Sequence, residues 1–256
     1  MTGTSPTRQG VEHVHRTIRE AILDGRLPPG TTMSQVTLAD ELGVSRTPLR
    51  EALRMLQNEG LVHSELNRRV RVSELSISDL EQLYAIRLPL EAAALRLSLP
   101  TMTPEHLAHL EGHMAEMAHF ADEQDYTRWY VPHRGFHEAL IAGAGQRVRD
   151  LLAELFDHAE RYRRFHMGRS FSDRTQAEHR GILDAVKAGH GNDAAAKLTE
   201  HLARSAVTVI EILEPAYEAI ALNQALADIS AALGKPVRVT REQGSEPARR
   251  VAQPTR

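Results

Sequence analysis

The sequence has no cysteine among its 256 residues, which excludes a disulfide framework and a thiolate metal site. It also lacks an apolar run long enough to span a membrane. The first ten residues, MTGTSPTRQG, contain no apolar stretch that would serve as a secretory signal. These absences predict a cytoplasmic protein with no membrane partner.

Motifs of the common enzyme classes are missing as well. The sequence shows no Ser/His/Asp arrangement, no P-loop and no dinucleotide fingerprint. The stretch FHEAL begins like the HExxH motif of zinc proteases, but Ile141 stands where that motif needs its second histidine. A metal-dependent enzyme built on a helical bundle stays an alternative, although no general base is evident. We expect that the protein is not an enzyme.

The charge is distributed unevenly along a chain whose length suits two domains of ordinary size. Residues 1–75 hold ten Lys or Arg against nine Asp or Glu, whereas residues 76–233 hold fifteen against twenty-three. Residues 234–256 carry six basic and two acidic side chains, are rich in Gly, Pro and Gln, and have no apolar face. This last segment is predicted to be a disordered basic tail.

The first 75 residues show helical periodicity followed by a strand pattern. Apolar residues recur at helical spacing from Val11 to Ile22, and VTLADELG predicts a second, short helix. A third helix is expected after Ser45, a suitable N-cap, with Pro48 in its first turn. The stretch LVHSELNRRVRVSEL then predicts two strands around a polar turn. Together these elements predict a winged helix-turn-helix domain over residues 8–75.

From Ser76 onward the strand signals vanish and amphipathic helical patterns follow one another. A further apolar segment starts at Pro215 and ends at Gly234. We therefore expect a mostly α protein, whose second domain covers residues 76–233, is entirely helical and follows a short linker. The first six helical patterns cover residues 78–98, 104–122, 125–143, 147–167, 173–188 and 192–213.

Arginines form two clusters in the first domain. Arg46, Arg50 and Arg54 lie four residues apart on the third helix, so they share one face. A basic helix face is often just solvated surface, but a helix after a tight turn can also present such side chains to base edges or phosphates. The second cluster lies on the expected wing and comprises Arg68, Arg69 and Arg71.

Two histidines, His133 and His137, stand four residues apart in YVPHRGFHEAL. On a helix both rings would leave the same face and could hold one metal ion, although 14 histidines in the chain make such a pair common by chance. Pro132 and Gly135 both disfavour a helix interior, so a kink that turns His133 away is the alternative. His106, His109 and His113, by contrast, repeat beside polar residues and are expected at the surface.

The stretches AILDGRLPPGTTM, LADELGVSRTPLREALRMLQNEGLV and NRRVRV closely resemble the DNA-binding domain of GntR-superfamily bacterial transcription regulators. The resemblance implies that Arg46, Thr47 and Arg50 contact double-stranded operator DNA in a major groove and that the wing tip touches the minor groove. Two positions depart from the family pattern. Arg69 replaces a glycine that is frequent at the wing tip, and Val36 replaces an arginine that contacts DNA in some members.

The stretches LYAIRLPLEAAALRL, HRGFHEALIAGAGQ and AEHRGILDAVKAGHGNDAAAKLTEHL resemble the FCD effector domain of the FadR-type subfamily, an antiparallel helical bundle. Family metal ligands fall on His133, His137, His179 and His201. The first of these positions usually holds an acidic residue, so four neutral imidazoles would favour Zn²⁺ or Ni²⁺ over Mn²⁺ or Mg²⁺. Should His133 point away, three histidines and water would complete the site.

The resemblance also implies a small organic acid as effector. Arg87 is a candidate to bind its carboxylate, and a salt bridge with a glutamate of the bundle is the alternative. Tyr130, Arg161 and Arg164 are further candidates to line the pocket. The expected function is a ligand-responsive transcription regulator that binds an inverted-repeat operator as a homodimer. A regulator whose metal is purely structural is the remaining alternative.

Overall fold

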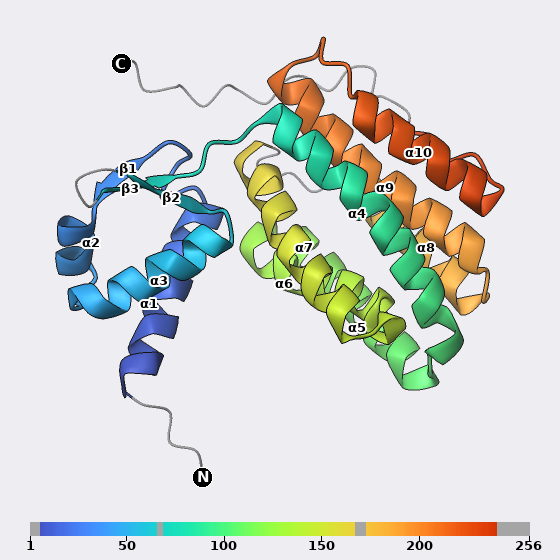
Figure 1. The fold of residues 1–256 in the computed structure, drawn as a ribbon. Helices are drawn as coiled ribbons and strands as arrows, with labels where there is room; N and C mark the ends of the chain where they lie inside the picture. The colour runs from blue at the N-terminus through green and yellow to red at the C-terminus, as the bar shows by residue number, and fades with distance from the viewer. Residues whose placement is uncertain (1–5, 66–68, 167–172, 240–256) are drawn as a thin grey trace. The chain divides into compact units, whose positions relative to one another are not determined.

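The structure is a computed structural model that describes residues 6–65, 69–166 and 173–239. These residues form ten α-helices and three short strands (Figure 1). They divide into two compact units: one contains the residues up to Ser76 together with residues 160–165, and the other contains the rest from Ile77 onward. No helix in the described ranges is both long and apolar enough to cross a membrane.

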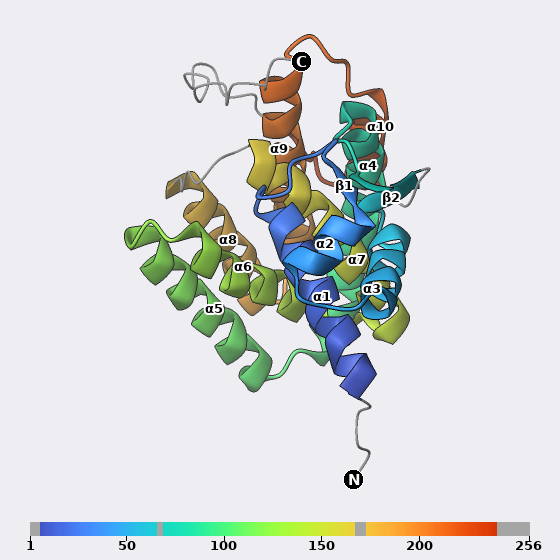
Figure 2. The same ribbon diagram turned by 90° about the vertical axis from the view of Figure 1, so that its left-hand side faces the viewer.

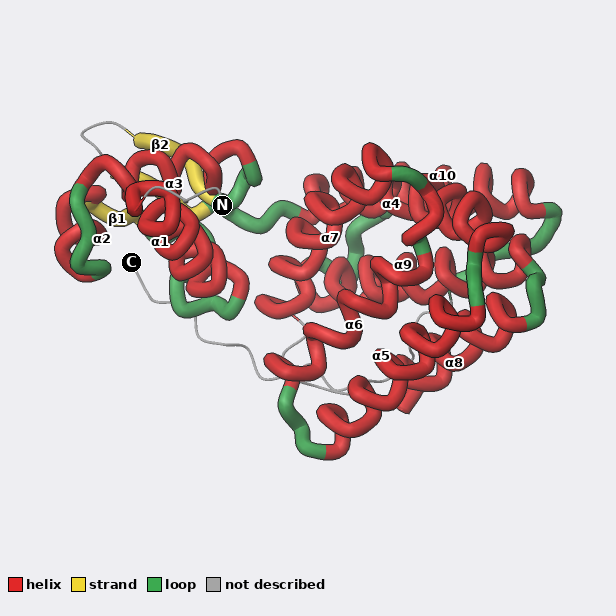
Figure 3. The backbone as a smooth tube through the Cα atoms, turned by 90° about the horizontal axis from the view of Figure 1, so that it is seen from below, coloured by secondary structure: helices red, strands yellow, loops and turns green. Residues whose placement is uncertain are grey.

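The first unit is a winged helix-turn-helix, as the sequence predicts. Its sheet is antiparallel with the strand order β1-β3-β2, and Figure 3 shows its strands in yellow. The sequence indicates only β2 and β3, because the three residues TMS of β1 are too short to show an alternating pattern. The elements are α1 (Pro6–Leu23), β1 (Thr32–Ser34), α2 (Gln35–Glu41), α3 (Arg46–Asn58), β2 (Val62–Glu65) and β3 (Arg69–Val72).

One apolar core joins these elements. Val14 and Ile18 of α1 pack with Leu49 and Leu56 of α3, and Val70 of β3 lies in the same cluster. All five side chains are at most 1% exposed, so the hydrophobic effect holds α3 against the rest of the unit while its other face remains in solvent. This packing leaves the face of α3 that carries Arg46, Arg50 and Arg54 exposed to solvent.

Helix ends in this unit are only partly capped by side chains. Ser34 caps α2, because its hydroxyl oxygen accepts a hydrogen bond from the backbone N–H of Val36 at 3.2 Å. Ser45 occupies the predicted N-cap position of α3 with extended backbone angles, but its side chain makes no capping hydrogen bond. Pro48 lies in the first turn of α3, as expected.

The second unit is entirely helical among its described residues. Helix α4 packs against α9 and α10 (Figure 1), whereas α5 packs against α6 and α8, and α8 against α9 (Figure 2). The predicted helical segments agree with the observed ones to within a few residues. The elements are α4 (Ile77–Ser98), η2 (Leu99–Thr101), α5 (Pro104–Asp122), α6 (Tyr126–Leu140), η3 (Ala142–Ala144), α7 (Gln146–His166), α8 (Asp173–Lys187), α9 (Gly191–Leu213) and α10 (Ile220–Leu233).

Helix α10 is anchored at its start by a buried carboxylate of α4. The carboxylate of Glu81 accepts hydrogen bonds from the N–H groups of Ala221 and Leu222, at 2.6 and 3.3 Å, and from the Tyr217 hydroxyl at 2.7 Å. A negative charge at a helix N-terminus is favourable because the free N–H groups and the helix dipole are positive there. Helix α10 is therefore an integral part of the bundle.

The chain after α10 stays packed for several residues. Lys235 forms an ion pair with Asp193 at 2.8 Å, and Val237 is only 7% exposed. The predicted basic tail, residues 234–256, thus begins with residues that contact the bundle. Its remainder, residues 240–256, lies outside the described residues.

Candidate functional sites

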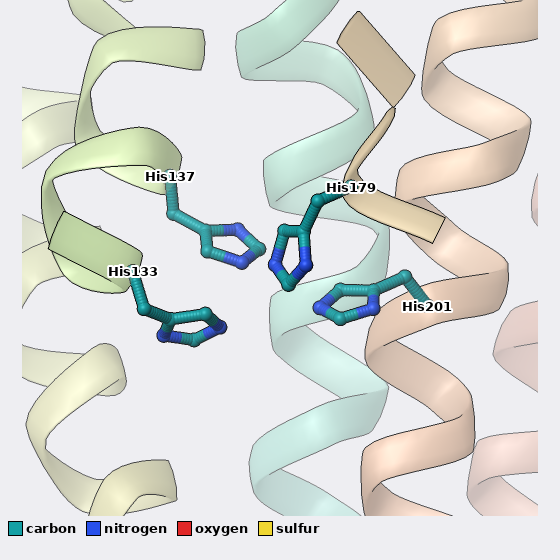
Figure 4. Close-up of side chains that lie close together, drawn as sticks. All are labelled: His133, His137, His179 and His201. Carbon is teal, nitrogen blue, oxygen red and sulfur yellow. The ribbon is translucent and has the colours of Figure 1, made fainter. Parts of the chain in front are cut away.

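Three helices bring four histidines to one point. Helix α6 carries His133 and His137, α8 carries His179, and α9 carries His201. Each is at most 5% exposed, and one ring nitrogen from each lies within 4.8 Å of those of the other three. Figure 4 shows the four rings pointing toward a common centre. The structure thus assembles all four positions that the family pattern indicates.

Helix α6 continues through both residues that were expected to interrupt it. Asp125 caps its start by accepting a hydrogen bond from the N–H of Arg128 at 2.9 Å. Pro132 lies inside the helix, yet His133 and His137 remain on one face with their ring centroids 4.7 Å apart. The alternative in which His133 turns away is therefore not what the structure shows.

Gly135 allows α5 to approach this part of α6 closely. A Cβ atom at Gly135 would lie 2.5 Å from Cε1 of His113, far inside van der Waals contact. The ring of His113 thus fills the space over the glycine and is only partly exposed, although it was expected at the surface. The glycine that weakens the helix locally is what lets the two helices pack.

Two of the four histidines are oriented by acceptors outside the cluster. Nδ1 of His201 lies 2.9 Å from Oε2 of Glu178, and Nδ1 of His179 lies 2.7 Å from the carbonyl oxygen of Thr175. These acceptors require a proton on each Nδ1, which leaves Nε2 as the ligand atom. Burial raises the pKa of Glu178, but the hydrogen bond from His201 and the charge of Arg204 outweigh it and the pKa is lowered.

Aromatic side chains surround the cluster. Trp129, the only tryptophan of the chain, stacks on His133 with ring centroids 4.4 Å apart and an interplanar angle of 22°. The ring of Phe156 meets His137 edge-on at 5.3 Å, and Tyr130 lies 6.4 Å from His133. Neither Trp129 nor Glu178 was predicted from the sequence, because each is recognised only by its contact with a histidine.

The residues present fit a divalent metal ion. Four neutral imidazoles form a nitrogen donor set that suits Zn²⁺ or Ni²⁺, and tetrahedral zinc places two nitrogen ligands about 3.4 Å apart at bond lengths of about 2.0–2.1 Å. The observed upper limit of 4.8 Å is wider, so the four nitrogens would have to move closer together around a tetrahedral ion. The carboxylate of Glu178 contacts His201 through Nδ1 of its ring.

Arg87 is buried beside this site but is already paired. Its guanidinium lies 2.6 Å from Oε1 of Glu91, one turn along α4, and 4.6 Å from the centroid of the Phe156 ring. The pair is at most 3% exposed, and burial raises the pKa of Glu91 against the opposing effect of Arg87. The expected alternative, an ion pair with a bundle glutamate, is present within one helix. The ring of Phe156 also contacts His137, so it connects the pair to the histidines.

Arg161 is committed to backbone oxygens of the first unit. Its guanidinium donates hydrogen bonds to the carbonyl oxygens of Gly60 and Glu74, both at 3.2 Å. These contacts hold its guanidinium in place, and a role of Arg161 in effector binding stays a prediction. The side chain of Arg164 lies outside the described ones.

Helix α3 presents the predicted basic face to solvent. Arg46, Thr47, Arg50 and Arg54 are all exposed, whereas the opposite face is buried in the core. Arg54 lies 3.6 Å from Glu51, a contact between exposed groups that contributes little to stability. Contact with a major groove would require this exposure, and the DNA contacts of these residues stay a prediction.

Among the described residues of the wing, one of the predicted basic side chains is paired with carboxylates. Arg69 is exposed on β3, but Arg71 forms ion pairs with Glu65 and Glu74 at 3.6 and 3.4 Å. Arg68 lies outside the described residues. Val36 is 38% exposed at the start of α2.

The fold and the exposed basic helix define a DNA-binding transcription regulator of the winged helix-turn-helix class, with a separate helical domain. The sequence matches the bacterial regulatory proteins of the gntR family over residues 11–72 and the FCD domain over residues 82–204. The chain belongs to the GntR family of transcription regulators, whose members bind DNA operators and effector ligands and are not enzymes.

Relatives agree with this assignment. An HTH-type transcriptional regulator of Agrobacterium vitis is 33% identical over 150 residues, which cover 57% of this chain and 88% of the relative. A probable D-xylose utilization operon repressor of Paenarthrobacter nicotinovorans is 32% identical over 71% of this chain and 80% of its own length. The fold of Escherichia coli McbR/YncC superposes with a TM-score of 0.71 at 20% identity, covering 84% of this chain and all of that one.

Proposed function

We propose that this regulator binds an inverted-repeat operator in the cytoplasm as a homodimer and responds to a small organic acid at a metal centre. The observation that carries the proposal is the cluster of four buried imidazoles on three helices. A divalent ion bound by all four imidazoles would link α6, α8 and α9, so metal binding would stabilise the bundle.

His133, His137, His179 and His201 would hold the ion, with Zn²⁺ or Ni²⁺ preferred. With a coordination number above four, the bound ion would supply a Lewis acid that accepts carboxylate oxygens of the effector in addition to the four imidazoles. The imidazoles contribute no charge, so an anionic effector is favoured by the full charge of the ion. Aromatic rings beside the histidines exclude water and strengthen that attraction.

Tyr130 and Arg87 are the proposed effector residues beside the metal. Tyr130 lies next to His133, on the same helix. Arg87 contacts the metal site indirectly, because the ring of Phe156 contacts both its guanidinium and His137. An effector that displaces the Phe156 ring therefore changes the surroundings of the Arg87–Glu91 pair.

Helix α7 offers the route from the effector to DNA. Phe156 lies on the part of α7 that belongs to the second unit, and residues 160–165 of the same helix belong to the first. We propose that an effector which displaces Phe156 also shifts the remainder of α7. This is the two-state element that we propose the effector biases.

Dimerisation is supported by the outer face of α4. Ile86 and Leu97, 56% and 60% exposed, lie eleven residues apart on a face that also exposes Pro89 and Ala93. Eleven residues are close to three helical turns, so these side chains form an apolar stripe. A second copy of the chain would cover it, and Ile86→Glu combined with Leu97→Glu should then convert a dimer into a monomer in light scattering.

The function is tested by operator binding measured with fluorescence anisotropy. The operator is first selected from a random DNA pool with the wild-type protein, and an inverted repeat is expected. Organic acids are then titrated in the presence of Zn²⁺, with wild type and His179→Ala compared. A change in operator affinity that requires both the acid and His179 supports metal-assisted sensing. An acid response that survives His179→Ala would instead assign the metal a structural role only.

A further inference from the structure

A carboxylate stands directly behind one of the four histidines and reaches it from another helix. Glu178 lies on α8, next to the ligand His179, but its Oε2 atom contacts Nδ1 of His201 on α9 at 2.9 Å. Its other oxygen, Oε1, forms ion pairs with Arg204 at 2.8 Å and Arg174 at 3.2 Å. The carboxylate of Glu178 is thus fixed by three side chains, those of His201, Arg204 and Arg174.

The two arginines fix the carboxylate, and the carboxylate fixes the imidazole. Arg174 lies one turn before Glu178 on α8, and Arg204 lies three residues after His201 on α9. The Glu178 side chain is 18% exposed and that of His201 only 6%, so solvent screens this contact weakly. A carboxylate that accepts the Nδ1 proton sets the tautomer of the ring and makes its other nitrogen a better metal ligand.

We propose that Glu178 is a positioning residue of the metal centre. It holds His201 with Nε2 toward the centre, and it brings a carboxylate, itself paired with Arg174 and Arg204, into contact with a ligand set that contains no carboxylate. The role matters more in this chain because His133 provides a neutral imidazole at the position where the family pattern places a negatively charged acidic ligand. The inference rests on the proposed metal site.

The test measures the dissociation constant of Zn²⁺ alone by competition with a chromophoric chelator. Glu178→Ala removes both the hydrogen bond and the charge, and we expect an affinity about 10–100-fold lower than wild type. Glu178→Gln keeps an acceptor oxygen for His201 but removes the charge, so a loss of about tenfold is expected. Glu200→Gln is the matched control, because Glu200 precedes His201 in the chain while its carboxylate accepts from the N–H of Arg238 at 3.3 Å.

A role confined to the ion pairs with the arginines would change stability without changing the metal ligands. The visible absorption of the Co²⁺-loaded proteins separates the two, since it reports the ligands of the ion. We expect an altered spectrum for Glu178→Ala and a wild-type spectrum for Glu200→Gln. Circular dichroism of the metal-free proteins checks their folding, and Glu178→Gln carries the test should the alanine variant not fold.

Two results would overturn the inference, and only one of them also refutes the proposed metal centre. If wild type binds Zn²⁺ and the dissociation constant of Glu178→Ala is within threefold of the wild-type value, the positioning role is refuted and the metal centre remains. Wild type that binds no Zn²⁺ refutes the positioning role and the metal centre together.

Discussion

Zinc should stabilise the second unit through the four histidines, and the size of the effect follows from simple linkage. An ion that binds only the folded state adds about 2.7 kcal/mol at a free concentration 100 times its dissociation constant. For a domain of this size, about 1 kcal/mol shifts the melting temperature by roughly 2–4 °C. We therefore expect Zn²⁺ at that concentration to raise the melting temperature by about 5–11 °C relative to protein treated with a chelator.

The substitution His179→Ala should abolish this shift, because His179 is fully buried and contributes one of the four nitrogens. The matched control is His109→Ala, which removes an exposed histidine of α5 and should keep the full shift. Differential scanning fluorimetry measures both. Emission of Trp129, stacked on His133, should change over the same zinc concentrations. An equal shift in wild type and His179→Ala would show that zinc binds elsewhere and would refute the reasoning.

Three further predictions concern single side chains. Arg50→Ala should weaken operator binding by about 1–3 kcal/mol if Arg50 contacts a base, and a wild-type affinity in the anisotropy assay would exclude that contact. His133→Asp should lower the preference for Zn²⁺ over Mn²⁺ by about tenfold, because the aspartate adds a hard oxygen ligand. Chelator competition with both ions measures the ratio of the two dissociation constants. An unchanged ratio would show that residue 133 is not a ligand. Gly135→Ala should destabilise the protein by no more than about 1–2 kcal/mol in urea denaturation, because its Cβ meets the ring of His113, whereas alanine gains about 1 kcal/mol over glycine inside a helix. Adding His113→Ala should recover most of that loss, and equal destabilisation of the single and double variants would argue against the steric cause.

Much of the fold was predictable because the apolar spacing is unambiguous. The recognition helix, the two wing strands and the bundle helices each show a period that matches one element type. Strand β1 was missed because three residues are too few to define a period, and its pairing with β3 depends on residues more than thirty positions away. A local sequence pattern does not reveal pairing between residues so far apart in the chain.

The metal centre was predictable from family resemblance, but not its surroundings. His133 and His137 are four apart in sequence, whereas His179 and His201 join them only through the packing of α6, α8 and α9. The contact of Glu178 with His201 depends on the same packing, so no local pattern reveals it.

Individual arginines were the least predictable part. Arg161 was expected in an effector pocket, but it donates to two backbone oxygens of the first unit. Arg71 was expected to add charge to the wing, but acidic neighbours neutralise it. A long cationic side chain reaches many partners, so its position along the chain does not decide which one it takes.

The most direct test of the central claim is the metal content of the purified, untagged protein, measured by elemental analysis for wild type and His179→Ala. The four-histidine centre predicts about one Zn or Ni per wild-type chain and a loss of that metal in the variant. A wild-type protein without metal after exposure to Zn²⁺ and Ni²⁺, or a variant that retains as much metal as wild type, would contradict the account.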